Sequence, residues 1–102
     1  MDTKYGNIPD KQFHAYQDKM IGKIYKLLPL CENSCDTLPK YIQSLIFELS
    51  GLNKILFNER QELVTILSIL EQLQYEKNFK IYRSQVFQCI KLIKNMCNPE
   101  VM

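Results

Sequence analysis

The most apolar stretch of this chain is Leu63-Val64-Thr65-Ile66-Leu67-Ser68-Ile69-Leu70-Glu71-Gln72-Leu73, in which seven of eleven residues are large and aliphatic. Of its polar residues, Thr65, Ser68 and Gln72 recur at intervals of three and four, which places them along one line of an α-helix. Every other direction around that helix must then be covered by protein. The stretch therefore predicts a central helix that other helices surround.

Length and composition bound the kind of protein to which such a helix can belong. The chain has 102 residues and a hydrophobic content of 46%, enough for one compact core, so we expect a single domain over residues 1–102. Only eight uncharged residues lie between Glu62 and Glu71, whereas a membrane span needs about 20. The first residues contain no apolar leader segment, so we expect a cytoplasmic location and no membrane as partner.

The spacing of apolar residues predicts four α-helices. They cover approximately residues 10–28, 38–50, 58–76 and 79–96. The connections are short, so consecutive helices should be antiparallel neighbours, and each helix has an apolar stripe wide enough for a shared core. We therefore expect an all-α fold, a small antiparallel four-helix bundle without strands. A short surface arm (residues 1–8) should precede it and a short tail (residues 98–102) should follow it.

Proline, glycine and capping residues predict where the helices begin and end. Pro29 should end the first helix, because the residue before a proline resists helical dihedrals. Gly51 should end the second helix near Ser50 by taking the left-handed conformation, and residues 53–57 should form a half-turn under the bundle. The sequence Asn-Glu-Arg-Gln at residues 58–61 matches a capping box and should begin the third helix.

Three apolar residues are not absorbed by the four predicted stripes. Phe47 lies roughly opposite the apolar face of its helix, so it is either covered by the segment around Ile55 and Phe57 or presented to a partner. We take Phe47, Ile55 and Phe57 as candidate partner-binding residues.

The four cysteines and the one histidine do not match a known metal-site pattern. A structural zinc site usually has two Cys pairs separated by two to four residues, whereas Cys89 and Cys97 are eight apart on the last helix. In a reducing cytoplasm we expect Cys31, Cys35, Cys89 and Cys97 to be free thiols. A di-iron bundle needs Glu-x-x-His pairs, and His14 is expected to be partly buried with no such role. We expect no metal and no cofactor.

Sequence features of the common enzyme classes are absent. The chain has no glycine-rich phosphate loop, no Gly-x-Ser-x-Gly motif, and no second histidine to activate a thiol or hydroxyl nucleophile. Its glutamates are expected on solvated helix surfaces, where burial would not raise the pKa of a carboxyl group for acid or base catalysis. We therefore expect a protein that is not an enzyme.

Basic residues gather on one side of the last predicted helix. They form what we call the basic face: Lys77, Lys80, Arg83, Lys91 and Lys94. No acidic residue interrupts it between Glu76 and Glu100. Such a face contacts phosphates or an acidic protein surface, or it is solvated and balanced by neighbouring acids.

Balance by neighbouring acids is the reading that we favour for the basic face. The preceding helix carries the glutamates Glu59, Glu62, Glu71 and Glu76. Within a Debye length of about 8 Å these charges would cancel most of the positive field. The net charge of +2, from 13 basic and 11 acidic residues, does not attract nucleic acid overall.

Two functional hypotheses follow. The first is a non-catalytic helical protein–protein interaction module, a subunit, adaptor or small inhibitor of a larger bacterial-type protein or complex, with self-association as a variant. The alternative is a nucleic-acid-binding accessory factor that uses the basic face. An exposed apolar patch would favour the first hypothesis and an unneutralised basic band the second.

Overall fold

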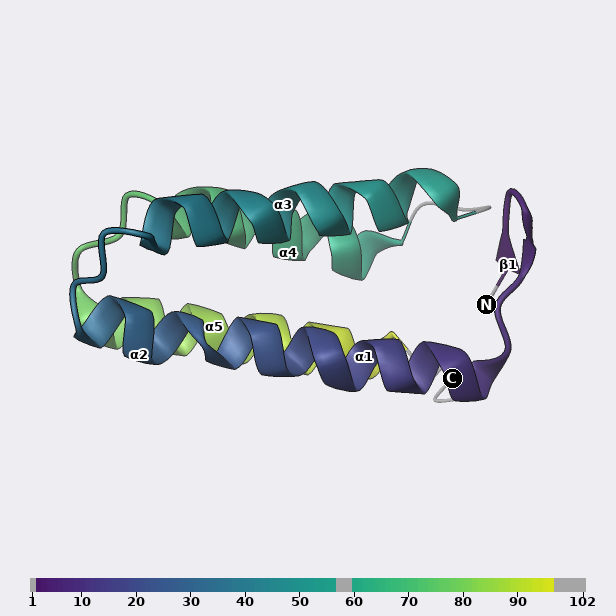
Figure 1. Cartoon of the computed structure of the whole chain (residues 1–102), viewed down its shortest axis with the longest axis horizontal. Coiled ribbons are helices and arrows are strands. Elements are labelled where there is room, and N and C mark those ends of the chain that lie inside the picture. The colour runs from purple at the N-terminus through teal and green to yellow at the C-terminus, as the bar shows by residue number, and fades with distance from the viewer. Residues whose placement is uncertain (1, 57–59, 97–102) are drawn as a thin grey trace.

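The computed structural model describes residues 2–56 and 60–96 of the chain. Its helices are α1 (Asp10–Tyr25), α2 (Leu27–Glu32), α3 (Leu38–Ile55), α4 (Gln61–Leu73) and α5 (Phe79–Asn95). α1 and α2 follow one another along the same side of the molecule, and α3, α4 and α5 run back and forth beside them (Figure 1). The predicted all-α fold, an antiparallel four-helix bundle, is confirmed.

The first predicted helix is divided into α1 and α2 at Lys26. The prediction that Pro29 ends a helix is wrong. Lys26 alone separates α1 from α2, and Pro29 lies in the first turn of α2, where the N–H that proline lacks has no intrahelical partner. In an unbroken helix the N–H of residue 29 would bond to the carbonyl of Tyr25. Proline cannot make this bond, so the helix breaks directly after Tyr25.

α2 ends in a Schellman motif. The N–H of Ser34 bonds to the carbonyl of Cys31 at 3.1 Å and the N–H of Cys35 to that of Leu30 at 3.0 Å. These are the two bonds that define the motif, and they require a left-handed residue between them. Ser34 takes that conformation with φ 49°, although a side chain makes it unfavourable.

Replacement of Ser34 by glycine should therefore stabilise the protein. Ser34→Gly relieves the left-handed strain while it adds freedom to the unfolded chain, so we expect a net gain of about 0.5–1 kcal/mol in the free energy of unfolding. Ser84→Gly, in the exposed interior of α5, is the matched control and should lose about 0.5 kcal/mol. Urea titration measures both, and a loss in Ser34→Gly would contradict the prediction.

α3 runs straight through Gly51, so the predicted helix end near Ser50 is wrong. Gly51 does not have a positive φ, and residues 53–55, expected in a half-turn, are helical. Leu52 and Leu56 extend the buried stripe of the helix. Their burial outweighs the cost of about 1 kcal/mol for glycine in a helix. Phe57, the last residue of the expected half-turn, lies outside the described residues.

The N-terminal arm is a small hairpin at the end of α3, although no strand was expected. β1 (Asp2–Thr3) pairs with β2 (Gly6–Asn7) in antiparallel register. Lys4 donates its N–H to the carbonyl of Ile55 at 2.7 Å, and Thr3 pairs with Leu56. The arm thus supplies a hydrogen bond to one of the carbonyls that a helix end leaves without a partner.

α4 is the most apolar helix but not the central one, so this prediction is wrong. It packs against α3 and α5, whereas α5 packs against α1, α2 and α4. Ser68 and Gln72 are exposed as expected, but Val64, Leu67 and Ile69 are only partly buried. A helix at the corner of a bundle buries one side and leaves its flanks half covered.

A side-chain cap begins α5 but not α4. α4 begins at Gln61 and ends at Leu73, inside the predicted range. Arg60 is extended and precedes the helix, so the predicted start in a capping box at residues 58–61 is wrong; residues 58–59 lie outside the described residues. α5 begins at Phe79 as predicted. The side chain of Asn78 accepts hydrogen bonds from the N–H groups of Lys80 and Ile81, which makes Asn78 the N-cap of α5.

Candidate interaction surface

The cysteines occupy separate environments. Cys31 and Cys35 lie at the end of α2, and Cys89 is buried in the core. Burial raises the pKa of the Cys89 thiol to about 12, whereas a hydrogen bond with the Thr37 hydroxyl at 3.0 Å lowers the pKa of Cys35. Cys97 lies outside the described residues.

Metal-binding side chains do not converge in the part of the chain that the structure describes. Within residues 2–56 and 60–96, no group of three or more His, Cys, Asp and Glu residues could hold a metal ion. His14 is exposed, so its expected partial burial is wrong. It lies on the flank of α1, just outside the stripe that the core covers.

The thiols should react with iodoacetamide in a fixed order, because the thiolate is the nucleophile. Cys35, with its lowered pKa, should be alkylated first. Cys31 should follow, since burial and the nearby Glu32 raise its pKa, and Cys89 should react only when the protein unfolds. Mass spectrometry of peptides at pH 8 reads each thiol separately. Alkylation of Cys89 in the folded protein as fast as that of Cys35 would contradict this order.

Phe47 is 83% exposed on α3. Gln43, Ser44 and Gly51, one helical turn away, are themselves exposed and either polar or small. Ile55 is partly buried on the same helix, and Phe57 lies outside the described residues. Single exposed apolar side chains are common on monomer surfaces, so the role of these residues in partner binding remains a prediction.

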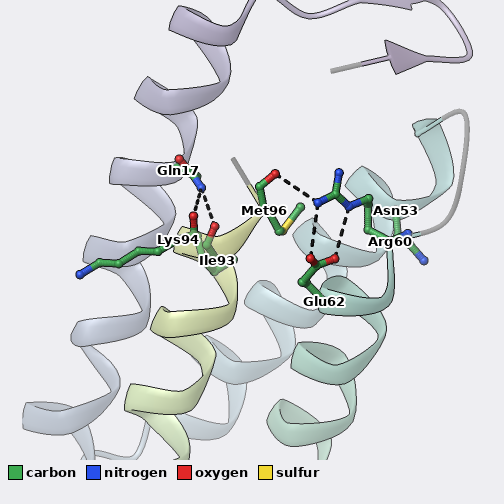
Figure 2. A network of polar contacts seen from close by, with 7 residues as sticks. All are labelled: Gln17, Asn53, Arg60, Glu62, Ile93, Lys94 and Met96. Atoms are coloured by element: carbon green, nitrogen blue, oxygen red, sulfur yellow. Dashed lines mark hydrogen bonds and ion pairs between the residues drawn. The ribbon is translucent and has the colours of Figure 1, made fainter. Parts of the chain in front are cut away.

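Two polar side chains bind the C-terminal end of α5 (Figure 2). The buried Gln17 of α1 donates from Nε2 to the carbonyl oxygens of Ile93 and Lys94. Arg60, at the start of α4, donates from its guanidinium to the carbonyl of Met96 at 3.2 Å. The last carbonyls of a helix lack the usual i+4 partner. These bonds supply donors to the carbonyls of Ile93, Lys94 and Met96, and the carbonyl of Ile93 also accepts from the N–H of Met96 at 3.2 Å.

Arg60 also connects α3 to α4. Its guanidinium lies 3.3 and 3.4 Å from the two carboxylate oxygens of Glu62, and its backbone N–H donates to Asn53 at 3.5 Å. Burial raises the pKa of Glu62, but hydrogen bonds from its own backbone and from Arg60, with the charge of Arg60, lower it overall. The network connects the ends of α3, α4 and α5.

The basic face lies beside α1, on the side of α5 that points away from α4. Lys80, Arg83, Lys91 and Lys94 are exposed along α5, while Lys77 lies in the connection before the helix. Phe87, in the middle of this face, contacts Tyr25 of α1, whereas Arg60, just before α4, contacts α5 at the carbonyl of Met96, beyond the basic face.

Glu62 and Glu71 of α4 therefore do not flank the part of the basic face that α5 carries, contrary to our expectation. Glu76 adjoins Lys77 in the connection, and Glu59 lies outside the described residues. Among residues 2–56 and 60–96 the ion pairs are Lys23 with Glu48 at 2.8 Å and Arg60 with Glu62 at 3.3 Å. Neither pair involves the basic face. The acids that share its side of the bundle are exposed residues of α1 and α2, including Asp18 and Glu32.

An aromatic cluster interrupts the basic face. Phe87 and Tyr25 of α1 meet edge to face, with ring centroids 5.9 Å apart and an angle of 80° between the rings. The guanidinium carbon of Arg83 lies 5.0 Å from the centroid of Phe87. Tyr25 remains 42% exposed and Phe87 38%. We call Tyr25, Arg83 and Phe87 the aromatic cluster.

Sequence reasoning missed Tyr25 and Phe87, although the signal was present. Phe87 stands four residues after Arg83 and four before Lys91, which places it within the basic face of a helix. Tyr25 lies outside the apolar stripe of its own helix, as Phe47 does. Only the packing of α1 against α5 brings the two rings together.

Within the described residues, no helix combines the length and the apolar character that a membrane crossing requires. Comparison of the chain with models of protein families, with curated proteins and with solved structures finds no match.

Proposed function

We propose that this chain is a non-catalytic protein–protein interaction module that acts as a subunit, adaptor or small inhibitor. The observation that carries the proposal is the aromatic cluster, in which Tyr25 and Phe87 remain partly exposed and Arg83 covers a ring. Tyrosine and arginine dominate the binding energy of protein interfaces, and Phe is enriched there. An edge-to-face pair packed between two helices is also held in place before binding, which reduces the entropy lost on association.

A second candidate function is nucleic-acid binding through the basic face. It is supported by the position of Phe87 among lysines, because bases stack on aromatic side chains beside a charged groove. It is also supported by the ion pairs of the described residues, which leave the basic face without a bonded carboxylate.

Recovery of a tagged copy from its native host tests the proposed function. Wild type, Phe87→Ser and Phe47→Ser are compared, with mass spectrometry of bound proteins and separate detection of bound nucleic acid. We expect a protein that is enriched with wild type and Phe47→Ser and lost with Phe87→Ser. Loss with Phe47→Ser alone would assign the contact to α3, and recovery of nucleic acid in place of protein would favour the second candidate.

A further inference from the structure

We infer that the seam between α1 and α5 binds an acidic amphipathic helix of a partner protein. This inference rests on the proposed function and names the chemistry of the partner. The docking face consists of Ile21, Tyr25, Lys80, Arg83, Phe87, Lys91 and Lys94.

The centre of the docking face is apolar. Phe87 packs against Tyr25 across the seam. Ile21 lies one turn before Tyr25 on the same side of α1 and is partly buried against the core. These side chains provide an apolar surface that the bundle already holds in place. An apolar side chain of a partner that packs on this surface would be removed from water.

Cations border this apolar centre along its length. Arg83 and Lys91 lie one turn before and one turn after Phe87, and Lys80 and Lys94 extend the row. From Lys80 to Lys94 the row spans about 21 Å, the length of a helix of roughly 14 residues. A partner helix with a leucine stripe and flanking glutamates complements this arrangement in charge and in length.

An acidic helix fits this surface better than a nucleic acid does. Asp18 shares a side of α1 with Tyr25, and Glu32 is exposed at the end of α2. These carboxylates would repel a continuous phosphate backbone, whereas a peptide can place its acidic residues opposite the cations alone. The net charge of +2 also provides little attraction for a polyanion at physiological salt.

The test uses a labelled 14-residue peptide (about 21 Å as a helix) with leucines on one side and glutamates on the flanks. Fluorescence anisotropy at 150 mM salt compares it with a scrambled peptide of the same composition, a 20-nucleotide oligothymidylate and a 20-base-pair duplex. We expect the amphipathic peptide to bind and the other probes not to bind. Phe87→Ser and the double variant Arg83→Glu, Lys91→Glu should each weaken binding roughly tenfold or more.

Matched controls separate the docking face from general effects. Phe47→Ser removes an exposed aromatic residue elsewhere, and Lys40→Glu with Lys54→Glu reverses two exposed charges on α3; both variants should bind within twofold of wild type. Circular dichroism melts confirm that each variant folds, and the charge reversal tests the face even if Phe87→Ser unfolds.

Several outcomes would overturn the inference. They are the absence of peptide binding, equal binding of the scrambled peptide, equal losses in the controls, and preferential binding of an oligonucleotide. The proposed function would survive each of the first three if the native host yields a protein partner that Phe87→Ser or Phe47→Ser releases. The two proposals therefore fail on different measurements.

Discussion

Leu70→Ala should lower the free energy of unfolding by about 2–5 kcal/mol, the largest loss that we expect from a single core truncation in α4. Leu70 is fully buried, with 0% of its surface exposed. Its removal leaves a cavity between α4 and the helices that cover it, in addition to the lost transfer energy of the deleted atoms. Chemical denaturation measures the loss, and the melting temperature should fall by roughly 10 °C or more.

Leu67→Ala is the matched control for that prediction. Leu67 lies on the same helix, one turn earlier, but it is only partly buried at the flank of α4. Water can enter the space that the alanine leaves, so we expect a loss of only about 1–2 kcal/mol. Equal losses in the two variants would show that the α4 flank is covered in solution and that the predicted central position was correct.

Apolar periodicity was sufficient to predict the bundle, because burial of apolar stripes provides most of the stability of a helical fold. It was not sufficient for the helix ends. Gly51 and Pro29 carry the local signals of a helix end, yet the chain stays helical at both positions. At Gly51, tertiary packing of the next turn outweighs the local preference of about 1 kcal/mol against glycine in a helix. At Pro29, the break at Lys26 places the proline in the first turn of α2, where its missing N–H costs no hydrogen bond.

The candidate site was predicted only in part, for a different reason. The lysines and Arg83 of the basic face follow from the period of one helix. The residues that neighbour the basic face in the fold cannot be predicted in this way, because a helical wheel does not show which other helix lies on which side. The expected balance by α4 was wrong for this reason, and the pairing of Tyr25 with Phe87 depends on contact between residues 62 positions apart in the chain.

The role of Gln17 also depends on how the helices pack. The sequence places this residue on an apolar face and shows no hydrogen-bond partner for it. Gln17→Met should lower the free energy of unfolding by about 1–3 kcal/mol. Methionine keeps the length of the side chain but removes Nε2, which donates to the carbonyls of Ile93 and Lys94. Two hydrogen bonds are lost, each with a net contribution of about 0.5–1.5 kcal/mol, although the carbonyl of Ile93 keeps the N–H of Met96 at 3.2 Å.

Gln12→Met provides the control for this last variant, because Gln12 is exposed on α1 and the same change should there stay within about 0.5 kcal/mol of wild type. The loss in Gln17→Met should be local as well as global. Relative to wild type, amide hydrogen exchange in this variant should accelerate more at the end of α5, near residues 93–96, than at its start. A variant as stable as wild type, with unchanged exchange there, would mean that the α5 carbonyls are satisfied without Gln17. The register between α1 and α5, and with it the pairing of Tyr25 and Phe87, would then depend on apolar contacts alone.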